Sequence, residues 1–202
     1  MTDQPGPLSE PPSDLSSRLP LLVTLDSGTV LSRFHDRDYG PIFFGRTGNY
    51  RFDAPDQSFG VLYAGRDEFC AFSETFGQST GIRVVTRAAL EQRHLSYLTT
   101  TVPLTLIDLV SSGGLARIGA DARLTSGSHA TAQRWSAALR DHPQGPAGLL
   151  YPARHDPPRS ACAFFDLPES TFETENTGSS MEAGHAGLLG KILDHYNFGL
   201  ID

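Results

Sequence analysis

Six side chains spread along the sequence could together act on a substrate that carries phosphates and a flat ring: Arg33, Arg51, Tyr63, Glu74, Tyr151 and Arg154. Two arginines on either side of a Gly-rich loop could hold a pyrophosphate, because guanidinium groups bind phosphates through paired, charge-assisted hydrogen bonds. A tyrosine at a strand end could stack on the ring, and a carboxylate off the apolar face of a helix could stabilise a cationic transition state. The residue types alone support this weakly, since loop arginines and exposed helix glutamates are common.

Other kinds of chemistry find less support. The sequence has no HExxH or CxxC metal motif and no Walker A or GxGxxG phosphate loop. Cys70 falls among phenylalanines, which favours an inert buried thiol. The neighbouring pairs His35/Asp36 and His155/Asp156 could meet around a metal ion, but surface positions explain them more simply. We therefore predict no metal, with a metal-dependent hydrolase as a third alternative.

The N-terminal candidates fall on short predicted elements. Residues 21–35 form extended segments that lead to Arg33. Residues 36–60, rich in Gly, Asp, Asn and Pro, form a long loop that carries Arg51, and long ordered loops are often functional. Residues 60–64 are predicted as a short buried strand that includes the candidate tyrosine.

A helix is predicted over residues 68–77, with Asp67 as its N-cap and Gly77 at its end. Its apolar face is formed by residues at the spacing i, i+3, i+7: Phe69, Phe72 and Phe76. Glu74 lies about 140° from the first of them, at 100° per residue. This glutamate is therefore expected to point away from the phenylalanine core.

Further strands are predicted over 102–109, 148–151 and 161–165, and further helices over 129–141 and 188–196. The longer helix follows a cap at Ser126 or Ser128 and turns three side chains inward: Trp135, Ala138 and Leu139. The strand at 161–165 is apolar throughout, which predicts a central place in the sheet.

With 202 residues, 39% of them hydrophobic and 19% charged, the chain can form one domain with a core. Its net charge of −7 lies at the ends, with −2 on residues 1–20, zero on 21–167 and −5 on 168–202. This leaves no basic patch for direct nucleic-acid binding. Residues 1–20 are predicted as a disordered Pro/Ser-rich tail, and residues 168–187 as a flexible acidic excursion of a domain spanning 21–202.

The two cysteines exclude a disulfide scaffold. No apolar stretch approaches the roughly 18–20 residues of a membrane span, and the N-terminus lacks the basic and apolar regions of a signal peptide. We therefore expect a cytoplasmic protein with reduced thiols and no membrane partner.

Ten stretches of the sequence resemble the RES domain, a family named for an Arg, a Glu and a Ser. Each stretch alone is nonspecific, but their order and spacing are specific, and the resemblance runs from about residue 29 to the C-terminus. The stretches are SRF (32–34), GPIFFG (40–45), YRFDAP (50–55), GVLYA (60–64), AFSET (71–75), LIDL (106–109), GLARIG (114–119), QRW (133–135), GLLY (148–151) and ILDHYNFGL (192–200).

The resemblance implies an α+β fold similar to that of ADP-ribosyltransferases, with a mixed sheet core and surrounding helices. RES proteins are typically NAD-consuming toxins of bacterial type II toxin–antitoxin systems, and their partner is an antitoxin with an Xre-like helix-turn-helix. Some cleave the nicotinamide–ribose bond of NAD by phosphorolysis, with inorganic phosphate as co-substrate, or by hydrolysis. At least one kind ADP-ribosylates a protein. Members often assemble with their antitoxins. The resemblance also allows this chain to form a homo-oligomer.

Carried over by motif, Arg33 is the family Arg and Glu74 the family Glu, which makes them the expected catalytic residues. Arg51 and Tyr63 match further positions of the NAD pocket, and Arg154 is a further candidate for NAD binding.

The family Ser is missing from this sequence. It usually lies two residues after the tyrosine of a Gly-x-x-Tyr strand, where this chain has Ala153, which offers no hydrogen bond. Ser160 or a water molecule could take its place. The alternative function is therefore a catalytically weakened RES-fold module that acts through an antitoxin-like partner.

Overall fold

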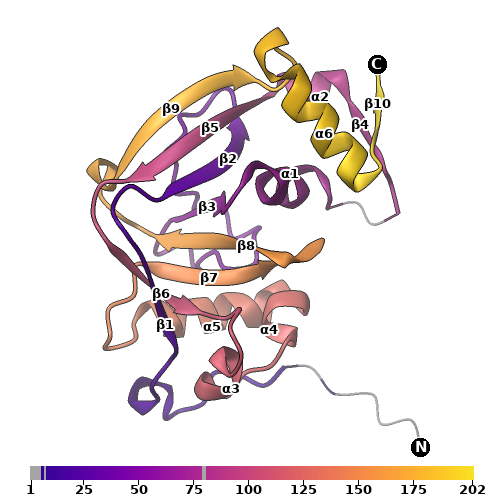
Figure 1. Cartoon of the computed structure of the whole chain (residues 1–202). Helices are drawn as coiled ribbons and strands as arrows, with labels where there is room; N and C mark the ends of the chain where they lie inside the picture. Colours follow the sequence, from indigo (N-terminus) through magenta and orange to yellow (C-terminus); the bar gives the residue numbers. More distant parts are fainter. Residues whose placement is uncertain (1–5, 7, 79–80) are drawn as a thin grey trace, which may run out of the picture.

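The computed structural model describes residues 6, 8–78 and 81–202. Its main sheet is built from eight strands: β1 (Leu22–Leu25), β2 (Val30–Asp36), β3 (Val61–Gly65), β5 (Arg93–Thr100), β6 (Leu104–Asp108), β7 (Gly148–Ala153), β8 (Asp156–Phe165) and β9 (Phe172–Ser179). They lie in the order β1-β6-β7-β8-β3-β2-β5-β9 (Figure 1). Only β6 and β7 pair in parallel, so the sheet is mixed.

The sheet opens between β3 and β2. These strands pair only at Ser32 and Gly65, whereas seven residue pairs join β2 to β5 and five join β3 to β8. In Figure 1, β2, β5 and β9 accordingly curve away from the layer that contains β3, β8 and β7. Backbone groups on the facing edges of β3 and β2 are therefore left for partners other than each other.

In the described residues six α-helices accompany the sheet: α1 (Glu68–Phe76), α2 (Arg87–Glu91), α3 (Gly114–Ile118), α4 (Arg123–Ser126), α5 (His129–Arg140) and α6 (Ala186–Tyr196). A second, two-stranded parallel sheet pairs β4 (Val84–Thr86) with β10 (Gly199–Ile201). Short 3-10 turns occur at Leu15–Ser17, Glu169–Thr171 and Ala183–His185.

Helix α1 follows β3 at once and lies against β2, β3 and β8. The Asp67 side chain accepts a hydrogen bond from the Cys70 amide at 2.8 Å, which confirms the predicted N-cap. A Cβ atom on Gly65 would lie 2.6 Å from the Ala71 backbone nitrogen, so only glycine permits this close strand–helix junction. Phe72 is fully buried among other aromatic rings, as the apolar spacing predicted.

Helix α5 begins at His129, the predicted start, and buries Trp135 and Leu139 completely. Ala138 is only partly buried. The buried face of α5 also carries polar side chains that form hydrogen bonds with the connection between β2 and β3. Gln133 donates to the carbonyl groups of Gly48 and Tyr50, and the Ser136 hydroxyl donates to the carbonyl of Phe52.

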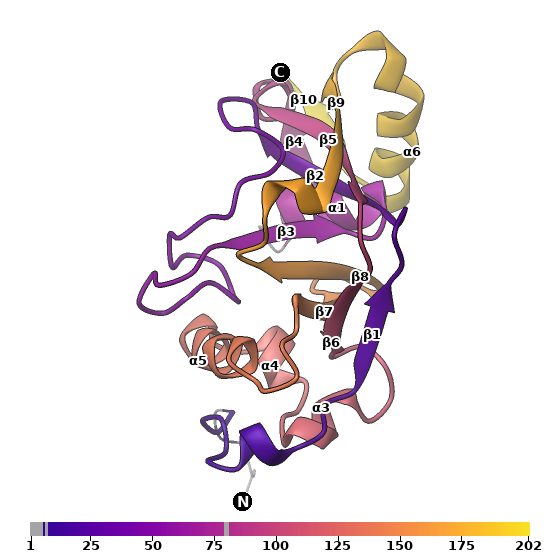
Figure 2. The same cartoon turned by 90° about the vertical axis from the view of Figure 1, so that its left-hand side faces the viewer.

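The connection at residues 37–60 contains no helix or ladder strand, as predicted, apart from one bridge between Gly45 and Val61. Figure 2 shows it on the same side of the sheet as α5. Strand β8 lies between β7 and β3, so the prediction of a central strand is confirmed.

The prediction for the acidic segment 168–187 was wrong. Residues 172–179 form β9, which pairs with β5 along six residues at the edge of the sheet. Most side chains of β9 are exposed or half-buried and polar, and edge strands often carry charged residues that discourage pairing with another chain. Polarity here therefore marks an exposed edge rather than a flexible excursion.

The prediction of a disordered N-terminal tail was also wrong for the described residues 8–20. Leu15 is buried in the core that contains Trp135, and the Trp135 indole donates to the Ser9 carbonyl at 2.9 Å. Glu10 forms a two-point ion pair with Arg134. The rest of the predicted tail, residues 1–5 and 7, lies outside the described residues, and within the described part no helix is long and apolar enough to cross a membrane.

Candidate active site

The Glu74 carboxylate lies on the side of α1 that faces the end of β7. Its Oε1 accepts a hydrogen bond from the Arg154 backbone amide at 2.9 Å. Its Oε2 lies 3.4 Å from the buried Tyr151 hydroxyl, which donates to it. As predicted, this side chain does not join the phenylalanine cluster, and it is held instead by groups at the end of β7.

Partial burial raises the pKa of Glu74 above its ordinary value. The Arg154 amide and the Tyr151 hydroxyl oppose this effect, and so do the positive charges of Arg51 and Arg154. Glu74 is therefore a carboxylate taken out of bulk water, with donors and cations arranged to favour its charged form.

The 37–60 connection brings Arg51 within range of the Glu74 charge. Arg51 is 9% exposed, and its Nη1 donates to the Gly127 carbonyl at 2.8 Å. Burial lowers its pKa, and the nearby Arg154 acts in the same direction while Glu74 opposes it. Its Nη2 is buried and has no hydrogen-bond partner among the described residues.

Arg33 lies where the sheet opens between β2 and β3. Its Nη1 donates to the Tyr63 carbonyl at 2.7 Å, and its Nη2 lies 3.5 Å from the Phe43 carbonyl. Burial lowers its pKa to about 10. Its Nε is buried and, within the described part of the chain, finds no acceptor. Arg33 thus binds an edge carbonyl that β2 leaves free, and retains one unused donor.

Tyr63 connects these two regions. Its carbonyl accepts from Arg33, while its hydroxyl donates to the buried Asp53 carboxylate at 3.0 Å and accepts from the Phe52 amide. The Tyr50 ring lies 5.7 Å from the Tyr63 ring. Because the Tyr63 hydroxyl is already used within the protein, its half-buried ring is the part that remains for a ligand.

The structure therefore places Arg51 and the Arg154 amide around Glu74. Arg33 contacts Tyr63, whose hydroxyl accepts from the Phe52 amide, next to Arg51 in the chain. The Arg154 side chain is exposed and makes no hydrogen bond or ion pair with the described residues, so the contact that ties this position to Glu74 comes from its backbone. A backbone donor leaves no mark in a sequence.

Ala153, where the resemblance leads us to expect the family serine, is 1% exposed and packs in the core. Ser160 pairs with Pro152 in the ladder, and its carbonyl accepts from the Cys70 thiol. Ser160 lines a different pocket, and no hydrogen bond among the described residues joins its hydroxyl to Glu74.

The histidine–aspartate pairs do not form a metal site in the described residues, where no group of three or more His, Cys, Asp or Glu side chains could hold a metal ion. His35 is buried, with Nε2 2.8 Å from the Ser96 hydroxyl and Nδ1 2.9 Å from the carbonyls of Asp36 and Tyr39. Both ring nitrogens thus already have partners.

Sequence reasoning missed the groups that hold the loop, namely Asp53, Gln133 and Ser136. Two of them are polar residues three apart on the buried face of α5. Buried polar side chains are nearly always hydrogen-bonded, so a polar pair on a predicted apolar face was the available signal for a bound loop.

Comparison with protein families gives one match, to the RES domain, over residues 30–182. The chain belongs to the RES domain family. The matched region contains Arg33, Arg51, Tyr63 and Glu74, together with the β7–β8 hairpin. No curated protein matches the chain.

The fold of this RES domain is similar to that of a chain in the crystal structure of the M. tuberculosis MbcT–MbcA toxin–antitoxin complex. The TM-score is 0.57 at 13% sequence identity, and the match covers 85% of this chain and 92% of the other. The predicted α+β fold with a mixed sheet core is confirmed by this match and by the strand order.

Proposed function

We propose that this RES domain is an NAD-degrading toxin of a bacterial type II toxin–antitoxin system and cleaves the nicotinamide–ribose bond. The observation that carries the proposal is a pair of buried guanidinium donors that find no acceptor among the described residues: Arg33 Nε, where β2 and β3 part, and Arg51 Nη2, whose guanidinium lies within range of the Glu74 charge. An unpaired buried donor costs about 1–3 kcal/mol. A ligand with several phosphate oxygens would satisfy both donors.

The proposed cleavage needs a negative charge near the ribose, and Glu74 would supply it. Breaking the nicotinamide–ribose bond builds positive charge on the ribose, as in glycoside hydrolysis. Nicotinamide leaves as a neutral base, so no general acid is required. Glu74 would stabilise the developing cation, and its partly desolvated position strengthens that interaction.

The remaining side chains would bind and orient the dinucleotide. We assign Arg33 and Arg51 to the phosphates of NAD, or to an inorganic phosphate that attacks the ribose. We assign the Tyr63 ring to the nicotinamide or the ribose, and the exposed Arg154 side chain to the rim of the site. The oxygen that takes the ADP-ribose would come from phosphate, water or a protein side chain.

The decisive experiment is product analysis of NAD incubated with purified protein, with and without phosphate. Free nicotinamide should appear, and the second product should be ADP-ribose, its 1″-phosphate or a modified protein. Glu74→Gln and Arg33→Ala should abolish most turnover, whereas Glu91→Gln, at an exposed end of α2, should not. Normal turnover in the first two variants would refute the assigned roles.

A toxin of this kind would act in the cytoplasm and be neutralised by an Xre-like helix-turn-helix antitoxin. The similarity of fold to a chain from a toxin–antitoxin complex supports this partnership. Expression alone should stunt bacteria and deplete NAD, and co-expression with the antitoxin should prevent both effects. Light scattering of the purified chain would test whether it also forms a homo-oligomer.

The buried Ala153 favours a second candidate, a binding module with little catalysis. The Ala153→Ser variant separates the two. If the chain is a weakened enzyme, the added hydroxyl should raise NAD turnover. If it is an inert binder, NAD turnover should be absent in both proteins while antitoxin binding persists.

A further inference from the structure

We propose that Arg159, on β8, is a positioning residue for the site, because it fixes α1 relative to the β7–β8 hairpin and thereby sets the position of Glu74. The catalytic consequence rests on the proposed NAD chemistry. The geometric claim concerns only the Glu74 contacts and can be tested without NAD.

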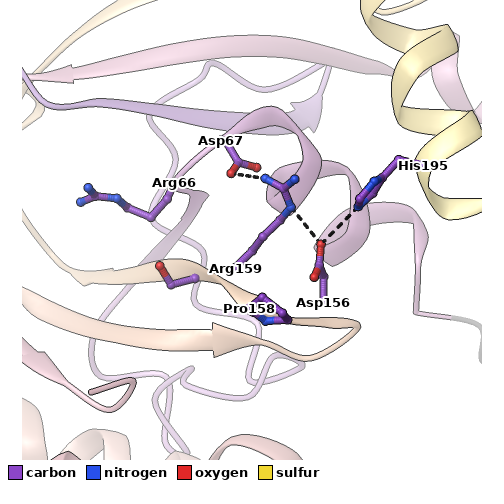
Figure 3. Close-up of a pocket in the computed structure, with 7 residues that line it drawn as sticks. Arg66, Asp67, Asp156, Pro158, Arg159 and His195 are labelled. Carbon is purple, nitrogen blue, oxygen red and sulfur yellow. Dashed lines mark hydrogen bonds and ion pairs between the residues drawn. The ribbon is translucent and has the colours of Figure 1, made fainter. Parts of the chain in front are cut away.

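Arg159 lies in a charged pocket outside the cluster around Glu74 (Figure 3). Its guanidinium forms an ion pair with Asp67, the N-cap of α1, through Nη1. Its Nε donates to Asp156, at the start of β8, at 2.9 Å. It also lies over the ring of Phe69, with Cζ 4.6 Å from the ring centre. One side chain thus holds the beginning of α1 and the turn end of the hairpin together.

The same two elements meet again at Glu74. The carboxylate of Glu74 on α1 accepts from the Tyr151 hydroxyl and the Arg154 amide, which lie on β7 and just after it. The hairpin carries a register shift between Pro152 and Ala153, and such an irregularity leaves its tip without a regular ladder to hold it. Near its turn the hairpin is held to α1 by side chains, and Arg159 supplies a contact separate from those of the Glu74 carboxylate, in addition to the Cys70–Ser160 contact further along β8.

The C-terminal helix α6 reinforces this contact, although it begins beyond the matched residues 30–182. The Tyr196 hydroxyl lies 2.7 Å from Asp156 Oδ2 and 3.1 Å from the Phe69 carbonyl. His195 Nε2 is 3.8 Å from the same aspartate oxygen. Asp156 is 14% exposed, so its interactions are better shielded from water than those of a surface ion pair.

Arg66 provides a matched control. It lines the same pocket, but Figure 3 shows its side chain pointing away from Asp67 and Arg159, and it forms no ion pair with the described residues. Arg66→Met and Arg159→Met therefore remove the same charge from the same pocket, and only the second removes ion pairs to Asp67 and Asp156.

The test follows the Arg154 amide by NMR as Glu74 titrates, since this amide donates directly to the carboxylate. In Arg159→Met the pH-dependent shift of that amide should shrink and its midpoint should move to higher pH, because the hydrogen bond that favours ionised Glu74 is weakened. Arg66→Met should titrate like the wild type. Arg159→Lys, which keeps the charge but not the two-point geometry, should fall between them.

The catalytic consequence is a fall in kcat of roughly ten- to a hundredfold with little change in KM, the scale expected for small misplacements of reacting groups. Tyr196→Phe removes one oxygen and should move the titration in the same direction to a smaller extent, so it carries the test if Arg159→Met does not fold. Unchanged titration in these variants overturns the proposal, as does an altered titration with unchanged kcat. A wild-type protein without NAD turnover would instead reject the proposed function.

Discussion

Glu74→Gln should make the protein more stable and less active at the same time. Because burial raises the pKa of Glu74 in the folded state, folding favours the protonated form and ionisation carries a penalty. That penalty is absent below the ordinary glutamate pKa of about 4.3 and is fully present above the folded-state pKa. A glutamine is neutral throughout, so the variant escapes the penalty at neutral pH.

The substitution preserves the local contacts. A glutamine oxygen can accept from the Arg154 amide, and its NH₂ group can donate to the Tyr151 hydroxyl oxygen. The lost attraction to Arg51 offsets part of the gain. We expect a net stabilisation of about 0.5–2 kcal/mol at pH 7, the range common for single stabilising substitutions. For a chain of this size each kcal/mol raises Tm by about 2–4 °C, while NAD turnover should fall about 10²–10³-fold.

Urea denaturation of wild type and Glu74→Gln at pH 7 and below pH 4 provides the assay, with Trp135 fluorescence as the signal. The difference in unfolding free energy should be present at pH 7 and vanish in acid, where both side chains are neutral. Glu91→Gln, an exposed carboxylate-to-amide change, controls for net charge. A Glu74→Gln protein that is less stable than wild type at pH 7, or a gap that persists in acid, would show that desolvation does not dominate at this carboxylate.

Three further predictions follow from other parts of the structure. Arg51→Met should weaken NAD binding by roughly 10- to 150-fold by calorimetry, since a hydrogen bond to a charged group contributes about 1.5–3 kcal/mol; an unchanged Kd would remove Arg51 from the site. Phe72→Ala should cost about 3–5 kcal/mol in urea denaturation because its ring is fully buried, and a loss below 1 kcal/mol would mean that the cavity collapses. Burial lowers the pKa of His35, so wild-type stability should fall as pH drops below about 6.5; His35→Gln should flatten that dependence, and equal pH profiles would contradict the shift.

Local patterns in the sequence were enough to predict α1 and the side of it on which Glu74 lies. The cap at Asp67, the phenylalanine spacing and the glycine that follows act within ten residues, so no distant contact is needed to recognise them. The same holds for α5, whose buried Trp135 follows from periodicity. The long connection at 37–60 was also predictable, because turn residues dominate it.

The contacts that assemble the site depend on the fold and could not be predicted in this way. Glu74 accepts from a backbone amide 80 residues further along the chain, and Arg33 donates to a backbone carbonyl 30 residues away. Strand β9 could not be predicted for a related reason. Its exposed polar side chains do not alternate with apolar ones, and only its pairing with β5 makes it a strand. The N-terminal segment, with Leu15 in the core, likewise depends on a distant helix.

The opening of the sheet between β3 and β2 explains how Arg33 comes to carry a buried donor without an acceptor in the described part of the chain. If β2 paired fully with β3, a backbone amide of β2 would donate to the Tyr63 carbonyl. That carbonyl would then not be free to accept from the Arg33 guanidinium. Because only one residue pair joins these strands, the Arg33 guanidinium donates to the free Tyr63 carbonyl, and its Nε finds no acceptor among the described residues. A substitution that extended the β2–β3 ladder should therefore displace Arg33 and remove phosphate binding, even though no proposed binding residue had changed.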